Sequence, residues 1–290
     1  MPFAMMPIDA KTQVYGIFGH PARHSLSPLI HNDQFKRLEM NAVYLAFDVE
    51  SDALGLAFES LRSLKICGVN VTIPHKEAAI NFIDEIPEDV DRCVGAVNTV
   101  VNRDGKLYGY NTDVNGFLIA LKEELSFSPQ GKTALVLGAG GAARGVVTAL
   151  SRAGAERVLV HNRTLSRAQG LTEYVAGFFP ETNLEAVRAP ESLKAEKIDL
   201  VVNATSLGMK AAQDPLPLDL QGFSKRPLVY DLVYGPVLTP FLESAKKLGL
   251  SFANGTGMLA AQGALAFELW TGQREGVREG MLETLKRCHL

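Results

Sequence analysis

The chain has 290 residues, of which 47% are hydrophobic and 21% are charged, and its formal net charge at pH 7 is −3. This length and composition are typical of a soluble globular protein with about two domains. The small negative charge and the lack of a long basic run argue against a surface that binds nucleic acid or an anionic membrane.

The sequence shows no signal for secretion, membrane insertion or metal binding. The first ten residues lack the basic region of a signal peptide, and no apolar run approaches the ~18 residues of a spanning helix. Cys67, Cys93 and Cys288 are odd in number and far apart, which argues against a disulfide framework and against a zinc site. We expect a cytoplasmic protein without a metal, either a monomer or a homodimer, whose partners are small molecules.

The first part of the chain alternates between patterns typical of strands and patterns typical of helices. We predict strands at 14–18, 43–49 and 68–72, and helices at 28–38, 54–63 and 76–82. Residues 96–102 and 106–110, joined through Asp104-Gly105, predict a β-hairpin with a tight turn. The alternation predicts an open α/β sheet, followed by a linking helix at 114–125.

A glycine-rich turn then follows an apolar strand at 133–137 and precedes a helical pattern at 144–153. This order is typical of a dinucleotide-binding site, in which Gly138 makes the tight turn and Gly140 lets the backbone approach the pyrophosphate. The helix N-terminus offers unpaired N–H groups to the phosphates. A flexible loop or ordinary helix–strand packing is the alternative interpretation of such a glycine run.

The end of the next strand, at 157–160, indicates which dinucleotide binds. An NAD site is expected to carry an acidic residue about 20 residues beyond the glycines, where it binds the ribose hydroxyls. This sequence has Asn162, Arg163 and Thr164 there instead, and a guanidinium with an amide and a hydroxyl suits a 2′-phosphate. We therefore predict NADP(H). In the alternative, Thr164 only caps a helix that begins near Ser166, and Arg163 is a solvated charge.

The remaining segments predict how the chain is divided. Further strands are expected at 184–187, 200–204 and 228–232, and helices at 258–270 and 277–287. The two C-terminal helices are too small to form a core of their own. We expect a substrate domain at 1–113, a nucleotide domain at 114–254, and helices at 255–290 that pack back on the first domain. That course would place the active site between the two lobes.

Two serines precede the first predicted helix. Ser27 occupies the expected N-cap position and Pro28 the first helical position, which explains one serine. The second hydroxyl, on Ser25, suggests an anion site at the positive end of the helix, suited to a substrate carboxylate. A serine hydrolase with His24 beside Ser25 is set aside, because the sequence contains no G-x-S-x-G elbow.

Four polar residues are candidates for the chemistry. Lys76 is predicted in a first helical turn, where a cation is disfavoured, and this misfit suggests a proton donor rather than a plain exposed charge. Asp113 is either an N-cap or the ion-pair partner of Lys76. Asn98 offers an amide to a substrate hydroxyl, and Gln262 is the polar exception in an apolar helix, where burial needs a partner.

Taken together, these motifs make the chain similar to the shikimate dehydrogenase family. The matching segments, in the family's order, are 19–21 to 31–32, 70–76, 95–99, 109–113, 138–144, 162–164, 203–206, 230–240 and 257–262. They cover nearly the whole chain, and the set is highly specific although each motif alone is not. Two small departures are Gly145, where the family more often has alanine, and Asn254, which replaces the usual aspartate.

The resemblance implies two α/β domains, the second of Rossmann type, and NADPH-dependent reversible reduction of 3-dehydroshikimate to shikimate. It implies Lys76 and Asp113 as the catalytic dyad. The implied substrate-binding residues are Ser25, Ser27, Thr72, Asn98, Tyr234 and Gln262. The implied cofactor-binding residues are Gly138, Ala139, Gly140, Gly141 and Ala142 for the pyrophosphate, Asn162, Arg163, Thr164 and Arg167 for the 2′-phosphate, and Leu232 and Gly255 for the nicotinamide.

Two other functions stay open at this point. A quinate/shikimate dehydrogenase with looser cofactor use is the nearest, and Arg163 without an acidic neighbour argues for the narrower NADP enzyme. A nucleotide-sensing protein without turnover is the other. The presence of both Lys76 and Asp113 argues against it, because sensing requires neither group.

Overall fold

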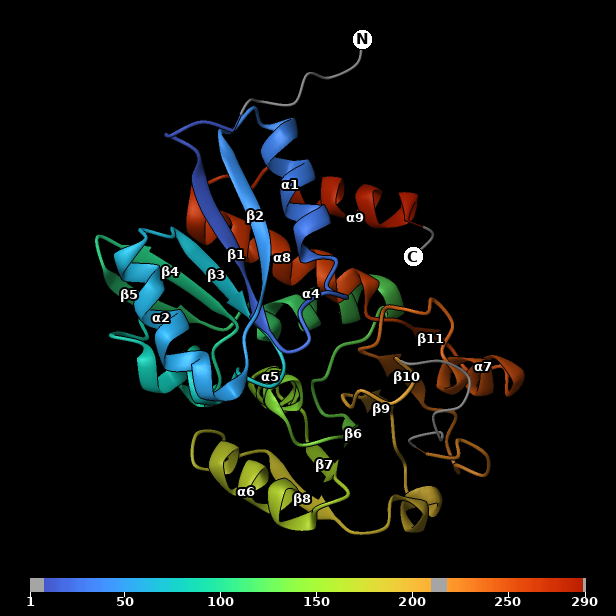
Figure 1. The fold of residues 1–290 in the computed structure, drawn as a ribbon. Helices are drawn as coiled ribbons and strands as arrows, with labels where there is room; N and C mark the ends of the chain where they lie inside the picture. The colour runs from blue at the N-terminus through green and yellow to red at the C-terminus, as the bar shows by residue number, and fades with distance from the viewer. Residues whose placement is uncertain (1–7, 210–217, 289–290) are drawn as a thin grey trace. The chain divides into compact units, whose positions relative to one another are not determined.

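The computed structural model describes residues 8–209 and 218–288 (Figure 1). Residues 1–7, part of the segment 1–10 considered above, lie outside these residues. The chain forms two compact units, one containing residues up to Thr112 together with Gln262–Cys288, the other containing Asp113–Ala261. Each unit is built on its own β-sheet, which confirms the prediction of two α/β domains. None of the described helices is long and apolar enough to cross a membrane.

The first unit has a five-stranded mixed sheet in the order β2-β1-β3-β4-β5. Its strands are β1 (Gln13–Gly19), β2 (Ala42–Asp48), β3 (Gly68–Val71), β4 (Thr99–Arg103) and β5 (Lys106–Tyr110). β1 pairs in parallel with β2 and β3, whereas β4 is antiparallel to both β3 and β5. Asp104 and Gly105, at φ 52° and 89°, form the tight turn of the predicted hairpin.

The helical elements of this unit differ from the prediction in several places. They are α1 (Ser27–Arg37), η1 (Ser51–Ala53), α2 (Leu54–Ser63), η2 (Ala78–Phe82) and α3 (Asp89–Val94). The helix predicted at 76–82 is the 3₁₀ helix η2, and Lys76 lies in the turn before it. α3 was not predicted, because six residues rich in charge show no hydrophobic periodicity.

The C-terminal helices belong partly to the first unit. They are α8 (Thr256–Thr271) and α9 (Val277–Arg287), and Figure 1 shows α9 beside α1. Along α9, Val277, Met281 and Leu285 recur every fourth residue and are buried, so one apolar stripe covers the core. The indole of Trp270 on α8 donates a hydrogen bond to the Val100 carbonyl of β4 at 2.9 Å. The tail therefore completes the core of the first unit.

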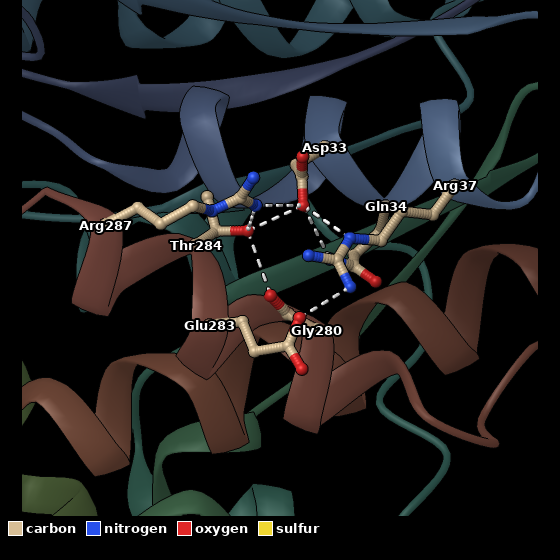
Figure 2. Close-up of polar contacts among 7 residues, drawn as sticks. All are labelled: Asp33, Gln34, Arg37, Gly280, Glu283, Thr284 and Arg287. Atoms are coloured by element: carbon tan, nitrogen blue, oxygen red, sulfur yellow. Dashed lines mark hydrogen bonds and ion pairs between the residues drawn. The ribbon is translucent and has the colours of Figure 1, made fainter. Parts of the chain in front are cut away.

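A polar cluster joins α1 to α9 at the rim of this contact (Figure 2). The Asp33 carboxylate accepts hydrogen bonds from the Thr284 hydroxyl at 2.6 Å and from the guanidinium groups of Arg37 and Arg287 at 2.7 and 3.1 Å. Arg37 also donates to Glu283 at 2.9 Å. These bonds hold the pKa of Asp33 below its usual value, against the opposing effect of burial. They connect the first α-helix of the described chain to the last.

His31 sits in the aromatic core between α1 and α8. It is 0% exposed, and its ring stacks on Tyr44 with 4.4 Å between centroids. Within residues 8–209 and 218–288, neither of its ring nitrogens has a hydrogen-bond partner. Burial accordingly lowers the pKa of His31 from 6.5 to about 3.

This lowered pKa predicts a pH-dependent stability. The folded state resists protonation of His31, so neutral His31 contributes to the free energy of unfolding. This contribution is present above pH 6.5 and is lost as the pH falls toward 3. Between pH 7 and pH 5, His31 is expected to remove about 2 kcal/mol from the free energy of unfolding. Denaturant titrations of the wild type and of His31→Phe across this range measure it. The difference between the two proteins should change with pH, and parallel profiles would contradict the account.

The second unit has a six-stranded parallel sheet in the order β11-β10-β9-β6-β7-β8. Its strands are β6 (Thr133–Leu137), β7 (Arg157–His161), β8 (Asn183–Val187), β9 (Leu200–Asn203), β10 (Leu228–Asp231) and β11 (Phe252–Ala253). This is the doubly wound Rossmann order, in which the chain runs one way from β6 to β8 and the other way from β9 to β11. Ligands of such sheets bind beyond the carboxyl ends of the strands at the switch point, here between β6 and β9.

The helices of the second unit were partly predicted. They are most of α4 (Thr112–Leu125), then α5 (Gly141–Arg152), α6 (Leu165–Ala176), η3 (Pro190–Ala195) and α7 (Pro240–Lys247). α7 was missed, although it carries a plain N-cap signal. Thr239 accepts a hydrogen bond from the Leu242 amide at 3.2 Å, and Pro240 opens the helix.

Candidate active site

The glycine turn lies at the switch point of the parallel sheet. Gly138 follows β6 at φ 115°, a conformation that favours glycine, and its amide donates to the His161 carbonyl at the end of β7 at 2.7 Å. A Cβ on Gly138 would lie 3.0 Å from the Ala204 carbonyl oxygen, just after β9. The turn is therefore held between the ends of the two neighbouring strands.

The start of α5 suits a bound pyrophosphate. Gly140 is the N-cap residue of α5 and has no side chain to cap the N–H groups of the first turn. Gly140, Gly141 and Ala142 are partly exposed, while Ala139 is buried beneath them. A Cβ on Gly140 would meet no protein atom within 4 Å, so the space above the turn is open. Uncapped amides facing open space fit the phosphates of a dinucleotide.

The residues predicted to bind a 2′-phosphate follow β7. Asn162 donates to the Thr164 carbonyl at 2.9 Å, which shapes the turn into α6, and Arg163, Thr164 and Arg167 are exposed. α6 begins at Leu165 with Thr164 at its N-cap position, but the Thr164 side chain makes no capping hydrogen bond. In the described part of the chain, no carboxylate pairs with Arg163. Its guanidinium is thus available to a phosphate, which favours the NADP(H) prediction over the simple cap.

Leu232 and Gly255 meet beyond β10. A Cβ on Gly255 would lie 2.1 Å from the Leu232 carbonyl oxygen, so only glycine allows this close approach. Asn254, the departure from the family pattern, accepts from the Thr256 amide and donates to the Val237 carbonyl, both at 3.0 Å. It therefore ties the loop to the start of α8. Tyr234 lies half-buried in the loop after β10.

A buried carboxylate that the sequence reasoning did not single out supports the same loop. Asp231, at the end of β10, accepts hydrogen bonds from the Thr239 hydroxyl at 2.6 Å, the Asn203 amide at 2.9 Å and the Val233 backbone at 3.0 Å. Burial raises the pKa of Asp231 to about 6, although these bonds lower it. A polar residue at a strand end, beside a second one on the next strand, was the available signal.

In the first unit, Asn98 is the centre of the predicted substrate site. It is 2% exposed, and its side-chain oxygen accepts from the Thr112 amide at 2.8 Å. Its side-chain nitrogen donates to the Thr112 hydroxyl at 2.9 Å and to the Gln262 side-chain oxygen at 3.5 Å. The structure therefore brings Asn98 and Gln262 together, as a common substrate-binding role requires, although 164 positions separate them in the sequence.

Lys76 and Asp113 lie on either side of this centre along the chain. The Lys76 carbonyl accepts from the Val97 amide at 2.8 Å, which places its backbone beside the residue before Asn98. Lys76 is half-buried, and its position in a turn removes the predicted misfit with a helix dipole. Asp113 is 3% exposed and lies inside the first turn of α4, so it is not the N-cap residue.

The start of α1 is shifted by one residue from the prediction, which changes the role of Ser27. α1 begins at Ser27 and its N-cap residue is Leu26, so Ser27 is not the cap. The Ser25 hydroxyl instead accepts a hydrogen bond from the Ser27 amide at 3.2 Å. Ser27 is buried and Ser25 is partly exposed. Thr72 is also partly exposed, and its amide donates to the Phe18 carbonyl of β1 at 2.9 Å.

No group of three or more His, Cys, Asp or Glu residues in the described ranges, 8–209 and 218–288, is arranged to hold a metal ion. The free cysteines Cys67, Cys93 and Cys288 are at least partly exposed. The candidate residues of the substrate site carry amides, hydroxyls, one ammonium and one carboxylate, and those after β7 add two guanidinium groups. Amides and hydroxyls can bind a polar organic substrate, an ammonium can protonate it, and a dinucleotide can supply redox chemistry.

Comparison with known proteins agrees with this arrangement. Family models match at residues 17–100 (Shikimate dehydrogenase substrate binding domain), 120–211 (Shikimate / quinate 5-dehydrogenase) and 255–286 (Shikimate 5′-dehydrogenase C-terminal domain). A shikimate dehydrogenase (NADP(+)) from Caldanaerobacter subterraneus subsp. tengcongensis is 46% identical over 268 residues, which are 92% of this chain and 95% of the relative.

Solved structures show the same similarity. A crystal structure of a shikimate dehydrogenase in complex with NADP+ has a TM-score of 0.89 and 36% identity, and the match covers 99% of both chains. The enzyme from Thermus thermophilus, in complex with NADP(H) and shikimate, has a TM-score of 0.83 and 40% identity over 95% of this chain and 99% of the other. The chain belongs to the shikimate dehydrogenase family of NADP-dependent oxidoreductases.

Proposed function

We propose that the protein catalyses the NADPH-dependent, reversible reduction of 3-dehydroshikimate to shikimate, a step of the shikimate pathway toward aromatic amino acids. The observation that carries the proposal is the site around Asn98, which joins Gln262 to Thr112 within a chain of this family. Relatives with 42% to 46% identity over most of the chain bear the name of this activity.

The proposed mechanism assigns proton transfer to the protein. NADPH, when bound, supplies the hydride that reduces the substrate's C3 carbonyl. The Lys76 ammonium donates a proton to the carbonyl oxygen as it becomes an alkoxide, and Asp113 orients Lys76 and accepts a hydrogen bond from the adjacent hydroxyl. In the reverse direction, Lys76 accepts that proton. The half-buried position of Lys76 favours this role, because partial exclusion of water strengthens its interaction with the developing charge.

The other residues are proposed to bind the two ligands. Ser25, Ser27 and Tyr234 hold the substrate carboxylate, and Thr72, Asn98 and Gln262 bind the ring hydroxyls. The turn from Gly138 to Ala142 holds the pyrophosphate, Asn162, Arg163, Thr164 and Arg167 hold the 2′-phosphate, and Leu232 and Gly255 line the nicotinamide. The observations that support the cofactor assignments are the open space above Gly140 and the exposure of Arg163, with which no described carboxylate pairs.

The reverse reaction separates this function from the nearest alternative. Initial rates with shikimate and with quinate, each measured with NADP+ and with NAD+, give four values of kcat/KM. We expect shikimate with NADP+ to be used best. Equal use of quinate and NAD+ would assign the broader quinate/shikimate activity instead, and no turnover with any pair would favour a nucleotide-sensing protein.

The glycine turn offers a further prediction for cofactor binding. In Gly140→Ala the new methyl group meets no protein atom within 4 Å, so the thermal midpoint should stay near that of the wild type. The same methyl group enters the space assigned to the pyrophosphate, and we expect the Kd for NADPH to rise about tenfold or more. Fluorescence titration with NADPH measures this Kd.

Gly170→Ala on α6 is the matched control, because its Cβ also meets nothing within 4 Å and lies away from the turn. It should bind NADPH as the wild type does. Unchanged affinity in Gly140→Ala would show that the space above the turn does not hold the cofactor.

A further inference from the structure

We propose that Tyr44 is a positioning residue of the substrate site, which holds Asn98, just before β4, in place through a buried chain of hydrogen bonds. Tyr44 lies in β2 and is itself assigned to neither ligand. Its role rests on the proposed function, since Asn98 is assigned there to the substrate. Tyr44 acts through Asn98.

The first half of the chain of hydrogen bonds is centred on the Tyr44 hydroxyl. Tyr44 is 1% exposed, and its hydroxyl donates to the Asn70 side-chain oxygen of β3 at 2.7 Å. Burial raises the pKa of Tyr44, so the phenol keeps the proton that it donates to Asn70.

The second half runs from Asn70 to Asn98. The Asn70 amide nitrogen donates to the Asn98 carbonyl and to the Thr99 hydroxyl, both at 3.1 Å. The Thr99 hydroxyl in turn donates to the Asn98 side-chain oxygen at 3.0 Å. The Asn98 side-chain oxygen is thus held by the Thr99 hydroxyl and the Thr112 amide, and its nitrogen is directed toward the Thr112 hydroxyl and toward Gln262, a proposed substrate-binding residue. Buried bonds of this kind strengthen one another.

Packing alone does not require the Tyr44 hydroxyl. The ring lies in an aromatic cluster, 4.4 Å from His31 and 6.0 Å from Trp270 between centroids, where phenylalanine would fill the same place. Tyr15 belongs to the same cluster, 5.3 Å from Trp270, but its hydroxyl donates to the Gln13 side-chain oxygen at 3.5 Å, and Gln13 does not belong to the proposed site. The two tyrosines share their burial and differ in what their hydroxyls hold.

This difference gives a matched pair of variants. Tyr44→Phe leaves the Asn70 oxygen without its donor, so we expect the KM for shikimate to rise roughly three- to tenfold with a fall in kcat. The KM for NADP+ should stay unchanged, because every proposed cofactor residue lies in the second unit. Tyr15→Phe should leave all these constants as in the wild type. Steady-state kinetics on the full chain, with thermal midpoints for each variant, provides the values.

Two further variants test whether the effect travels along the chain of hydrogen bonds. Thr99→Val breaks the chain of hydrogen bonds at the Asn98 end and should raise the KM for shikimate in the same way. This variant tests the positioning role even if Tyr44→Phe folds poorly. Thr99→Val combined with Tyr44→Phe should raise KM by less than the product of the two single effects, because both variants break the same chain of hydrogen bonds.

The outcomes separate the inference from the proposed function. Three outcomes would overturn the positioning role alone. They are wild-type constants in Tyr44→Phe, a rise in the KM for NADP+ equal to that for shikimate, and single effects that multiply in the double variant. A wild type that does not oxidise shikimate would overturn the proposed function and this inference with it.

Discussion

Lys76→Ala is expected to lower kcat by about 10²- to 10⁴-fold, the usual contribution of a general acid, with a smaller change in KM. The alkoxide formed on hydride addition has no other ammonium assigned to protonate it in the proposed site. The structure changes the basis of this prediction. Lys76 is half-buried in a turn beside Val97, so its role no longer depends on an unfavourable helix dipole. Initial rates with saturating 3-dehydroshikimate and NADPH measure the effect.

Lys106→Ala is the control for Lys76→Ala. Lys106 belongs to the same unit, but it is exposed and pairs with Glu85 at 2.8 Å on the hairpin. Removing an exposed ion pair of this type has little effect on stability and should leave kcat unchanged. A rise in KM alone after Lys76→Ala would reassign Lys76 to substrate binding.

Arg163→Ala is expected to remove about 1.5 to 3 kcal/mol of the preference for NADPH over NADH, the range for hydrogen bonds to charged groups. That energy corresponds to about 10- to 150-fold in the ratio of the two kcat/KM values. The expectation rests on an exposed guanidinium at the carboxyl end of β7 that no described carboxylate neutralises. The loss should fall on NADPH, because NADH carries no 2′-phosphate.

Arg152→Ala provides the comparison for Arg163→Ala. Arg152 ends α5, at the opposite end of the helix from the glycine turn, and donates to Asn115 at 3.0 Å. Its removal should leave the ratio of NADPH to NADH unchanged. If Arg163→Ala also leaves that ratio unchanged, Arg163 does not hold the phosphate, and Arg167 or Asn162 becomes the candidate.

Local signals predicted most of the second unit. The strand at 133–137, the glycine turn and the following helix depend on neighbouring residues, and the structure places them together at the switch point of the sheet. The same holds for the hairpin around Asp104-Gly105, whose turn chemistry is carried by two residues. Where residues close in sequence determine the backbone conformation, the prediction from the sequence pattern agrees with the structure.

Errors arose where a neighbour in space decides the outcome. α1 begins one residue earlier than predicted, where the Ser25 hydroxyl accepts from the Ser27 amide. The chain of hydrogen bonds through Tyr44 joins residues 26 to 29 positions apart, and a tyrosine in a strand gives no sign of such partners. Pairing between distant segments is set by sheet order and packing, which periodicity does not contain.

The forward reaction tests most directly whether the protein reduces 3-dehydroshikimate with NADPH. NADPH and 3-dehydroshikimate are mixed with the full-length protein, the reduced-nicotinamide absorbance is followed, and the product is identified. We expect rapid loss of absorbance with one shikimate formed for each NADPH consumed, and slow loss when NADH replaces NADPH. Binding of both ligands without any loss of absorbance would contradict this expectation and favour a nucleotide-sensing protein.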